Sequence, residues 1–224
     1  MLAEVNEQTE VAARDYLHGP DRSIKVAVMC TIGPRRISRF LAHYHSVHSN
    51  TRVVTFDVAH NQLIDRLLDG HADCALVGAE VNDEQRTNSM PLYREQLVLV
   101  HSKQHPFTSR ESVTLDDVLE EPYLNRLSCE FRFLFIERCQ EKGFEPNIRV
   151  LSDNDAWIQT LIRDNVGVSI MPQESIIIDG LATTPLNAEN MQRDVSLIVP
   201  TGREDTADIR NFLQVAREYQ WSAD

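Results

Sequence analysis

The alternation of apolar and polar positions along the first third of the chain predicts strands separated by helices. Three compact apolar runs are typical of buried strands: Ile24–Met29, Val53–Val58 and Cys74–Gly78. Between them, apolar residues recur every three or four positions over residues 34–47 and 61–69, which is helical spacing. Pro34 suits a first helical position, and Gly70 suits the position just past a helix end. Parallel strands need such crossover helices, so this region predicts a βαβαβ unit.

A second set of elements follows the first. Apolar runs predict four more strands, at Leu97–His101, Ile148–Leu151, Gly167–Pro172 and Val195–Val199. Capping residues and helical spacing predict helices after Thr114, at Glu130–Lys142, from Asp153 to Asn165, and from Ile209 to Tyr219. Two α/β units in one chain predict two lobes. The chain would cross between them at Met90–Gln96 and Ser196–Pro200, forming a hinge beside a ligand cleft.

Composition narrows the class of protein. The 224 residues suffice for two lobes of about 100 residues each, and 42% apolar content is ordinary for a globular chain. No run of 18 apolar residues and no apolar segment near the start occur, so we expect neither a membrane span nor a signal peptide. Four cysteines at unpatterned spacing then predict a reducing, cytoplasmic location instead of a disulfide scaffold.

The net charge is −12, from 22 Lys and Arg against 34 Asp and Glu. Proteins that bind duplex DNA present clustered cations, because DNA is a polyanion. The densest basic cluster here is Arg35, Arg36 and Arg39, which we expect to be a solvated helix face. These residues alone should therefore not bind DNA.

Cys129 precedes a predicted helix and is flanked by Arg126 and Arg132. Unpaired N–H groups at a helix N-terminus and nearby cations favour thiolate over thiol, so this cysteine is a candidate redox trigger. The alternative is that it is a small buried hydrophobe, the usual role of a free cysteine. Cys139 lies on a helical stripe with Phe131 and Phe135, which indicates packed core.

Other chemical signals are weak. Cys74 lies in a predicted strand and is expected in the core; Cys30 lies at a strand end, where it either lines the cleft or is structural. His60 follows the second strand and either orients a ligand or sits in water. No metal-binding motif occurs, and His43, His45 and His48 do not share one helix face, so we predict no metal and no cofactor. No catalytic motif occurs, and an enzyme is not predicted.

Five segments, in this order and spacing, resemble the effector-binding region of LysR-type transcriptional regulators. They are Val26–Phe40, Gln62–Leu76, Pro91–Val100, His105–Phe107 and Gly167–Pro172. The resemblance implies an α/β fold of two Rossmann-like lobes joined by two hinge crossings, a periplasmic-binding-protein-like (type II) architecture. A transport-type solute-binding protein shares this plan and is the alternative.

The resemblance also implies a domain organisation. Residues 1–20 would be the end of a linker helix, 21–92 and 199–224 lobe I, and 93–198 lobe II. The family's DNA-binding winged helix-turn-helix is absent from this chain, which we interpret as a fragment that meets DNA only through that missing N-terminal domain. A homodimer is expected, with a tetramer in the full-length form. Ile37 and Val47 widen the apolar surface of the helix after Pro34, which suggests a face for the second copy.

Within the family, two motifs resemble the peroxide-sensing OxyR branch. Thr31–Pro34 matches the branch's first-strand loop, where a threonine helps to hold peroxide, and Cys129 falls at the position of its peroxidatic cysteine. Cys139 falls near the resolving one, at a spacing one residue longer. Ser128 stands where the branch has histidine, and His60 where it has a second threonine. Two effector classes therefore stay open. One is an oxidant (peroxide or hypochlorite) that acts through Cys129 and Cys139. The other is a small organic or inorganic anion that binds without redox chemistry.

The expected ligand site joins the two loops. Backbone N–H groups near Thr31–Gly33 and Ser128–Glu130 would converge on one small polar or anionic effector, and the hydroxyls of Thr31 and Ser128 would add donors. The predicted ligand-binding residues are Thr31, Ile32, Gly33, His60, Ser128, Cys129 and Glu130.

Overall fold

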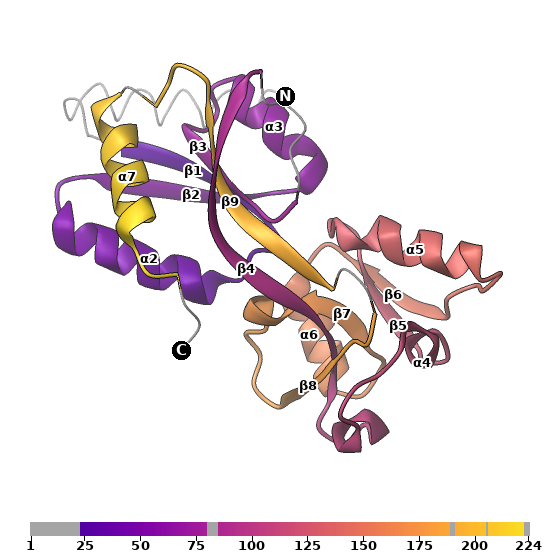
Figure 1. Cartoon of the computed structure of the whole chain (residues 1–224). Coiled ribbons are helices and arrows are strands. Elements are labelled where there is room, and N and C mark those ends of the chain that lie inside the picture. The colour runs from indigo at the N-terminus through magenta and orange to yellow at the C-terminus, as the bar shows by residue number, and fades with distance from the viewer. Residues whose placement is uncertain (1–22, 80–84, 189–190, 205, 222–224) are drawn as a thin grey trace, which may run out of the picture.

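The computed structural model describes residues 23–79, 85–188, 191–204 and 206–221. The predicted linker helix, residues 1–20, lies outside the described residues. The described chain forms two lobes joined by a pair of long strands (Figure 1).

Lobe I is built on three parallel strands, with β1 hydrogen-bonded to both β2 and β3. Its elements are β1 (Ser23–Met29), α2 (Pro34–Val47), β2 (Arg52–Val58), α3 (His60–Leu68), β3 (Cys74–Val77) and α7 (Ala207–Glu218). The predicted βαβαβ unit is thus confirmed. Helices α2 and α7 pack through aromatic side chains, with the ring centroids of Phe40 and Phe212 5.2 Å apart. Both rings are buried in a single apolar core.

Two antiparallel strands carry the chain between the lobes: β4 (Thr87–Ser102) and β9 (Gln192–Pro200) (Figure 1). The sequence predicted a strand only from Leu97 and treated residues 90–96 as a crossing segment. The strand is longer than predicted, because the crossing segment is itself strand, paired from Thr87 opposite Pro200 to Gln96 opposite Gln192. An irregularity between Pro91 and Tyr93 interrupts the register. The connection is therefore a two-stranded ribbon, which side chains of both strands can line.

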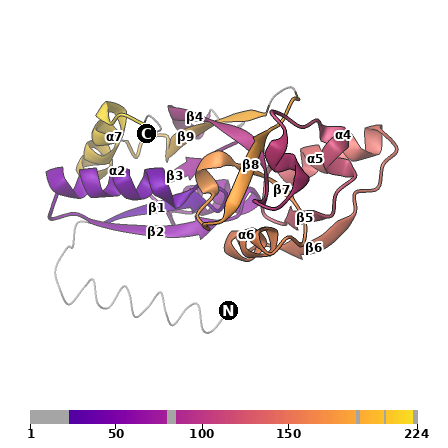
Figure 2. The same ribbon diagram turned by 90° about the horizontal axis from the view of Figure 1, so that it is seen from below.

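Lobe II extends the same sheet, since β7 and β8 both pair with β4, and it adds a parallel pair formed by β5 and β6 (Figure 2). Its strands are β5 (Tyr123–Arg126), β6 (Ile148–Ser152), β7 (Ser169–Pro172) and β8 (Leu181–Pro185). Its helices are α4 (Leu115–Leu119), α5 (Phe131–Glu141) and α6 (Asp155–Arg163), with short 3-10 turns η1 (Pro106–Ser109) and η2 (Gln173–Ser175). Strand β8 was not predicted. Helix α6 is capped by Asn154, one residue later than the predicted Asp153.

The buried apolar residues separate into distinct cores. The lobe I core receives Tyr93 and Val195 from the ribbon, whereas Leu97 and Met191 pack into one of two lobe II cores. The two-lobed α/β architecture predicted from the resemblance is confirmed. The lobe boundaries at residues 92/93 and 198/199 stay a prediction, because β4 and β9 run without a break through both lobes.

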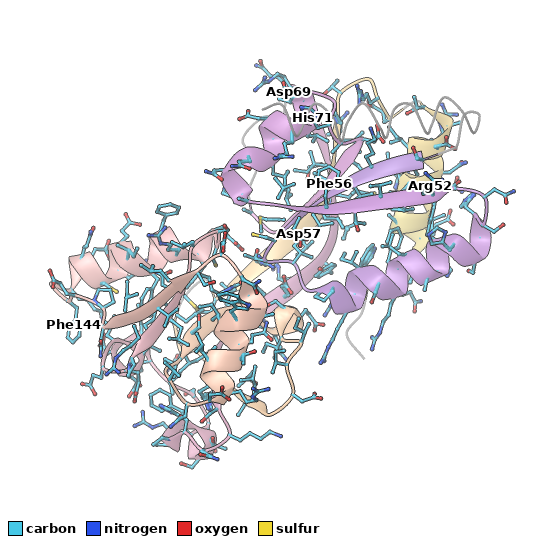
Figure 3. All side chains as sticks on the ribbon, turned by 180° about the vertical axis from the view of Figure 1, so that it is seen from behind. Arg52, Phe56, Asp57, Asp69, His71 and Phe144 are labelled. Atoms are coloured by element: carbon cyan, nitrogen blue, oxygen red, sulfur yellow. The ribbon has the colours of Figure 1, made fainter. Side chains whose placement is uncertain are left out.

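Strand β2 is an edge strand of the large sheet among the described residues, and Figure 3 shows Arg52, Phe56 and Asp57 along it. On the adjoining helix α2, Val47 is exposed, but Ile37 is buried in the lobe I core. The apolar surface that we inferred for α2 is therefore narrower than predicted. Among the described residues, no helix is both long and apolar enough to cross a bilayer.

Candidate functional site

The β1–α2 loop of lobe I meets the start of α5 of lobe II through Thr31 and Glu130. Thr31 is buried, and Glu130 is the N-cap residue of α5. The Thr31 hydroxyl donates a hydrogen bond of 3.0 Å to Oε2 of Glu130. The structure thus brings together two of the predicted ligand residues, 99 positions apart in the sequence.

Arg193, on β9, lies at the centre of this contact. Its Nη1 donates to the Thr31 hydroxyl oxygen at 2.7 Å and also to the Glu130 carboxylate, while its Nη2 donates to the Thr31 carbonyl at 2.9 Å. Its Nε donates to Oε1 of Glu95, on the paired strand β4, at 2.7 Å. A Cβ on Gly78 would lie 2.7 Å from the guanidinium, so glycine there leaves the space that Arg193 fills.

Charge balance at this cluster favours the ionised arginine. Burial alone lowers the pKa of Arg193, but the charges of Glu130 and Glu95 outweigh it and leave that pKa raised. Burial raises the pKa of Glu95, with Arg193 opposing the shift. One buried cation is therefore shared by two carboxylates, of which one, Glu130, comes from the facing lobe. Such a guanidinium beside a hydroxyl is a site for a carboxylate group.

The predicted backbone donors are partly engaged elsewhere. The N–H of Ile32 donates to the Met29 carbonyl at 2.8 Å, and that of Cys129 to the Arg126 carbonyl at 3.2 Å. Each of these two N–H groups closes a local turn, and convergence of the other N–H groups of the two loops on an anion stays a prediction. The donors that do converge on a carboxylate are the side chains of Arg193 and Thr31.

The predicted ligand contacts of Ser128, Gly33 and His60 stay predictions, and each residue has the following surroundings. Ser128 contacts lobe I through its carbonyl, which accepts from the Cys30 thiol at 3.6 Å. Gly33 makes room between the lobes, since a Cβ there would lie 1.8 Å from the Glu174 carbonyl oxygen. His60 begins α3, half-buried, and in the described chain we find no hydrogen bond from it to Thr31 or Glu130.

Cys129 is buried, with 5% of its surface exposed. Its sulfur accepts from Nη1 of Arg126 at 3.5 Å and from the Phe131 backbone N–H. Burial nevertheless raises the pKa of the Cys129 thiol, and Arg126 only opposes that shift. Arg126 is itself paired with Asp155, through Nε to Oδ1 at 2.7 Å. In this conformation desolvation outweighs the arginine and the helix N–H and disfavours the thiolate that the local sequence favours, and the redox role of Cys129 stays a prediction.

Arg132 and Cys139 complete the predicted redox site. The Arg132 guanidinium sits 5.7 Å from the centre of the Phe133 ring. Cys139 is fully buried in the core with Phe131 and Phe135, which confirms the structural role that its helical stripe indicated. At 1.5 Å per residue, about 12 Å of helix separates Phe131 from Cys139.

A second contact between the lobes uses another arginine. Arg36, on α2, donates from Nη2 to Oε1 of Glu174 at 3.1 Å and from Nη1 to the Trp221 carbonyl at 2.6 Å. Its guanidinium carbon lies 4.5 Å from the centre of the Tyr93 ring. The expectation that Arg36 belongs to a solvated face is wrong, because its side chain is covered by lobe II and by these aromatic residues.

Sequence reasoning missed Arg193 and Glu95, although their strands carried a signal. Side chains alternate between the two faces of a strand. Arg193 is in phase with the buried Val195 and Leu197, and Glu95 is in phase with the buried Leu97. A charged residue at an inward position of each paired strand indicates a buried ion pair. In the described chain, no group of three or more His, Cys, Asp and Glu is arranged to hold a metal ion.

Comparison with known proteins gives a consistent set of matches. The family described as LysR substrate binding domain matches residues 17–221. The hydrogen peroxide-inducible genes activator of Dickeya chrysanthemi is 22% identical and covers 97% of this chain and 75% of its own length. The DNA-binding transcriptional dual regulator OxyR of Escherichia coli K12 is 21% identical, over 90% of this chain and 67% of its own.

Solved structures with the same fold include two complexes of effector-binding domains. The effector binding domain of QuiR in complex with shikimate superposes with a TM-score of 0.73 at 21% identity, covering 88% of this chain and 96% of that one. The BenM effector binding domain with its effector benzoate superposes with a TM-score of 0.70 at 19% identity, covering 88% of this chain and 90% of that one.

Proposed function

We propose, from the premise that the chain belongs to the LysR substrate binding domain family, that it senses a small carboxylate held by Arg193 and Thr31 between its lobes. The chain is the effector-binding domain of a LysR-type transcriptional regulator, and its relatives are regulators rather than enzymes. This membership favours a regulator over the transport-type solute-binding protein. The identity of the effector is the part that we infer.

The observation that carries the proposal is the position of the Glu130 carboxylate. It sits on the Thr31 hydroxyl and the Arg193 guanidinium, and so occupies the place that an effector carboxylate would take. Exchanging one carboxylate for another keeps the number of charges around buried Arg193 unchanged, so the exchange avoids the cost of an unpaired buried ion. Since Glu130 is the N-cap residue of α5 and belongs to lobe II, release of its carboxylate would free lobe II from the β1–α2 loop and shift a two-state equilibrium.

The ligands of structural neighbours support this chemical class. Shikimate and benzoate, bound to QuiR and to BenM, are both small carboxylates. An arginine fork beside a hydroxyl recognises that group through its shape as well as its charge.

The test is calorimetric titration of the domain with shikimate and with benzoate. Glu130→Gln removes the charge that competes for Arg193, so affinity for a carboxylate should rise about tenfold or more, the equivalent of about 1.5 kcal/mol for one charged hydrogen bond. Glu137→Gln, an exposed change on the same helix, is the matched control and should leave affinity unchanged. Unchanged or weaker binding by the Glu130 variant would contradict the proposal.

A second candidate function is oxidant sensing through Cys129. The specific observation in its favour is that Arg126 and the Phe131 N–H both contact the sulfur and would stabilise a thiolate once burial is relieved. Peroxide-responsive relatives point the same way. If the full-length regulator's response to peroxide or hypochlorite is unchanged by Cys129→Ser, this candidate fails.

We further propose that the regulator acts as a homodimer, and as a tetramer in its full-length form, with DNA contacted by an N-terminal domain. The acidic charge of −12 makes duplex binding by this domain itself unfavourable. Light scattering that gives only 25.6 kDa at micromolar concentration would count against the dimer. Salt-sensitive duplex binding by this domain would count against the division of roles.

A further inference from the structure

We propose that Cys30 of lobe I, and not Cys139, is the residue with which Cys129 forms a disulfide under oxidation, and that this bond ties the two lobes together. The inference rests on the second candidate function, because it requires Cys129 to be oxidisable. The inference replaces the expected partner of Cys129, Cys139 of lobe II, with Cys30 of the facing lobe.

The first argument is proximity. The Cys30 sulfur lies 3.6 Å from the Ser128 carbonyl oxygen, which belongs to the peptide group joining Ser128 to Cys129. Standard peptide geometry then puts the Cys129 Cα within about 6.5 Å of that sulfur. The Cys30 Cα lies beyond its own sulfur, so reaching the Cα separation of a disulfide, about 4.4–6.8 Å, takes rotation of both side chains and an approach of the two loops, but no unwinding of a helix.

The second argument is the cost of the alternative. Cys139 is a fully buried residue of α5, and the helix turns between Phe131 and Cys139 separate it from Cys129. A bond between Cys129 and Cys139 requires unwinding of those turns and exposure of Phe131 and Phe135 from the core. Cys30 follows the last residue of β1, and its N–H is held by the Val58 carbonyl at 3.1 Å, so the sheet fixes it beside lobe II without any such unfolding.

The third argument is access. Cys30 is half-buried, whereas Cys129 is buried, so a hydroperoxide reaches Cys30 first. Burial, with the negative charge of Asp155, raises the pKa of the Cys30 thiol to about 11, and Arg126 opposes that shift. Little Cys30 thiolate is present at neutral pH, so oxidation is slow. The disulfide would therefore form under prolonged exposure to the oxidant and not as a rapid response.

The chemistry balances with a hydroperoxide as the oxidant. The Cys30 thiolate attacks the O–O bond, which breaks as an S–O bond forms; the alcohol or water leaves, and Cys30 becomes a sulfenic acid. The Cys129 thiolate then attacks that sulfur, the S–S bond forms, and the S–O bond breaks to release water. Two thiols lose two protons and two electrons, and one hydroperoxide is reduced.

The bond would bear directly on the carboxylate site. Cys30 adjoins Thr31, and Cys129 adjoins Glu130, so a bridge between the cysteines holds Glu130 on the Thr31 hydroxyl. Oxidation should therefore weaken binding of a carboxylate probe, a consequence that depends on the first proposed function. The bond itself does not depend on it.

Peptide mapping tests the proposal, because trypsin places each cysteine in its own peptide: residues 26–35, 67–86, 127–132 and 139–142. The domain is treated with hydrogen peroxide, its free thiols are blocked, and it is digested without reduction. We expect peptide 26–35 joined to 127–132, in the wild type and in Cys139→Ser. Cys30→Ser should lose the joined pair.

Two results would overturn the inference while leaving oxidant sensing intact. They are peptide 127–132 joined to 139–142, and Cys129 oxidised to sulfinic acid in the wild type with no joined peptide. A Cys129 that stays fully reduced under peroxide would overturn both. The wild-type map decides between these results, so the conclusion does not require that every serine variant fold.

Discussion

Two of the contacts between the lobes are each built on an arginine that reaches a glutamate of lobe II, and they differ in how firmly the arginine is held. Arg36 is held by Glu174, by the Trp221 carbonyl and by the Tyr93 ring. Within the described chain we find no hydrogen bond from Arg36 to a second carboxylate. Arg193 is shared between Glu95 and Glu130.

Each contact also has its own glycine, and the two glycines face different atoms. Gly33 makes room for backbone atoms of η2, and Gly78 makes room for the end of the Arg193 side chain. Backbone cannot move aside without moving the lobe, whereas a guanidinium can. The comparison therefore indicates a permanent contact at Arg36 and an exchangeable one at Arg193, where a ligand anion can replace Glu130.

The largest effect is expected from Gly33→Ala. Its Cβ would meet the Glu174 carbonyl oxygen at 1.8 Å, so the lobes must separate there, at a cost of about 1–3 kcal/mol in the free energy of unfolding. Gly78→Ala is the matched variant and should cost less, because only Arg193 has to shift. Denaturant unfolding of both measures the difference, and a larger loss for Gly78→Ala would reverse the assignment of the two contacts.

Glu174→Gln should weaken the permanent contact without touching the exchangeable one. Loss of the charged partner of Arg36 is expected to lower stability by about 1.5 kcal/mol. Affinity for benzoate or shikimate should stay unchanged, in contrast to the rise expected for Glu130→Gln. Titration calorimetry beside thermal unfolding separates the two readouts. A parallel gain in affinity for the Glu174 variant would mean that the two contacts act as one.

The pH dependence of thiol alkylation reports on the exchangeable contact, because Cys30 borders it. Its raised pKa of about 11 predicts that the rate of its reaction with iodoacetamide climbs about tenfold per pH unit between pH 7 and 10. A thiol with a raised pKa gains thiolate only as pH rises toward that value, so no plateau should appear before about pH 11. A plateau near pH 8 would mean that Cys30 is not desolvated by the facing lobe.

The smallest effect is expected far from both contacts, at the start of α4. The Thr114 hydroxyl and the Asp117 carboxylate form a capping box, and hydrogen bonds from Thr114 and Arg110 lower the pKa of Asp117 to about 2. A lowered carboxyl pKa contributes stability above its usual value of about 3.9, and that stability is lost as pH falls toward 2. Thr114→Ala should cost about 1 kcal/mol and leave affinity for carboxylates unchanged.

The fold was predictable from sequence where apolar periodicity was strong, and the site was predictable only in part. The βαβαβ unit of lobe I followed from its three apolar runs, and Thr31 and Glu130 were named from the loops that hold them. The ribbon was missed because polar residues between Tyr93 and Gln96 hid a strand that lies at the junction of two lobes. Arg193 was missed because it stands next to Asp194, which is exposed, and two adjacent charged residues indicate a surface position. Its burial becomes evident only when the paired strand with Glu95 is known.

The role of Cys129 shows the same limit. Its local sequence gives a helix start and an arginine, and both do contact the sulfur. Burial comes from Phe131, Phe135 and the rest of that core, which the local sequence does not specify. Desolvation then decides the direction of the pKa shift.

The most direct test of exchange at Arg193 is a crystal structure of the domain with a bound carboxylate, benzoate or shikimate, whichever binds more tightly by calorimetry. The account predicts the ligand carboxylate within hydrogen-bond distance of the Arg193 guanidinium and the Thr31 hydroxyl, with Glu130 displaced and the Arg36–Glu174 pair retained. A ligand bound elsewhere, with Glu130 still on Arg193, would contradict it.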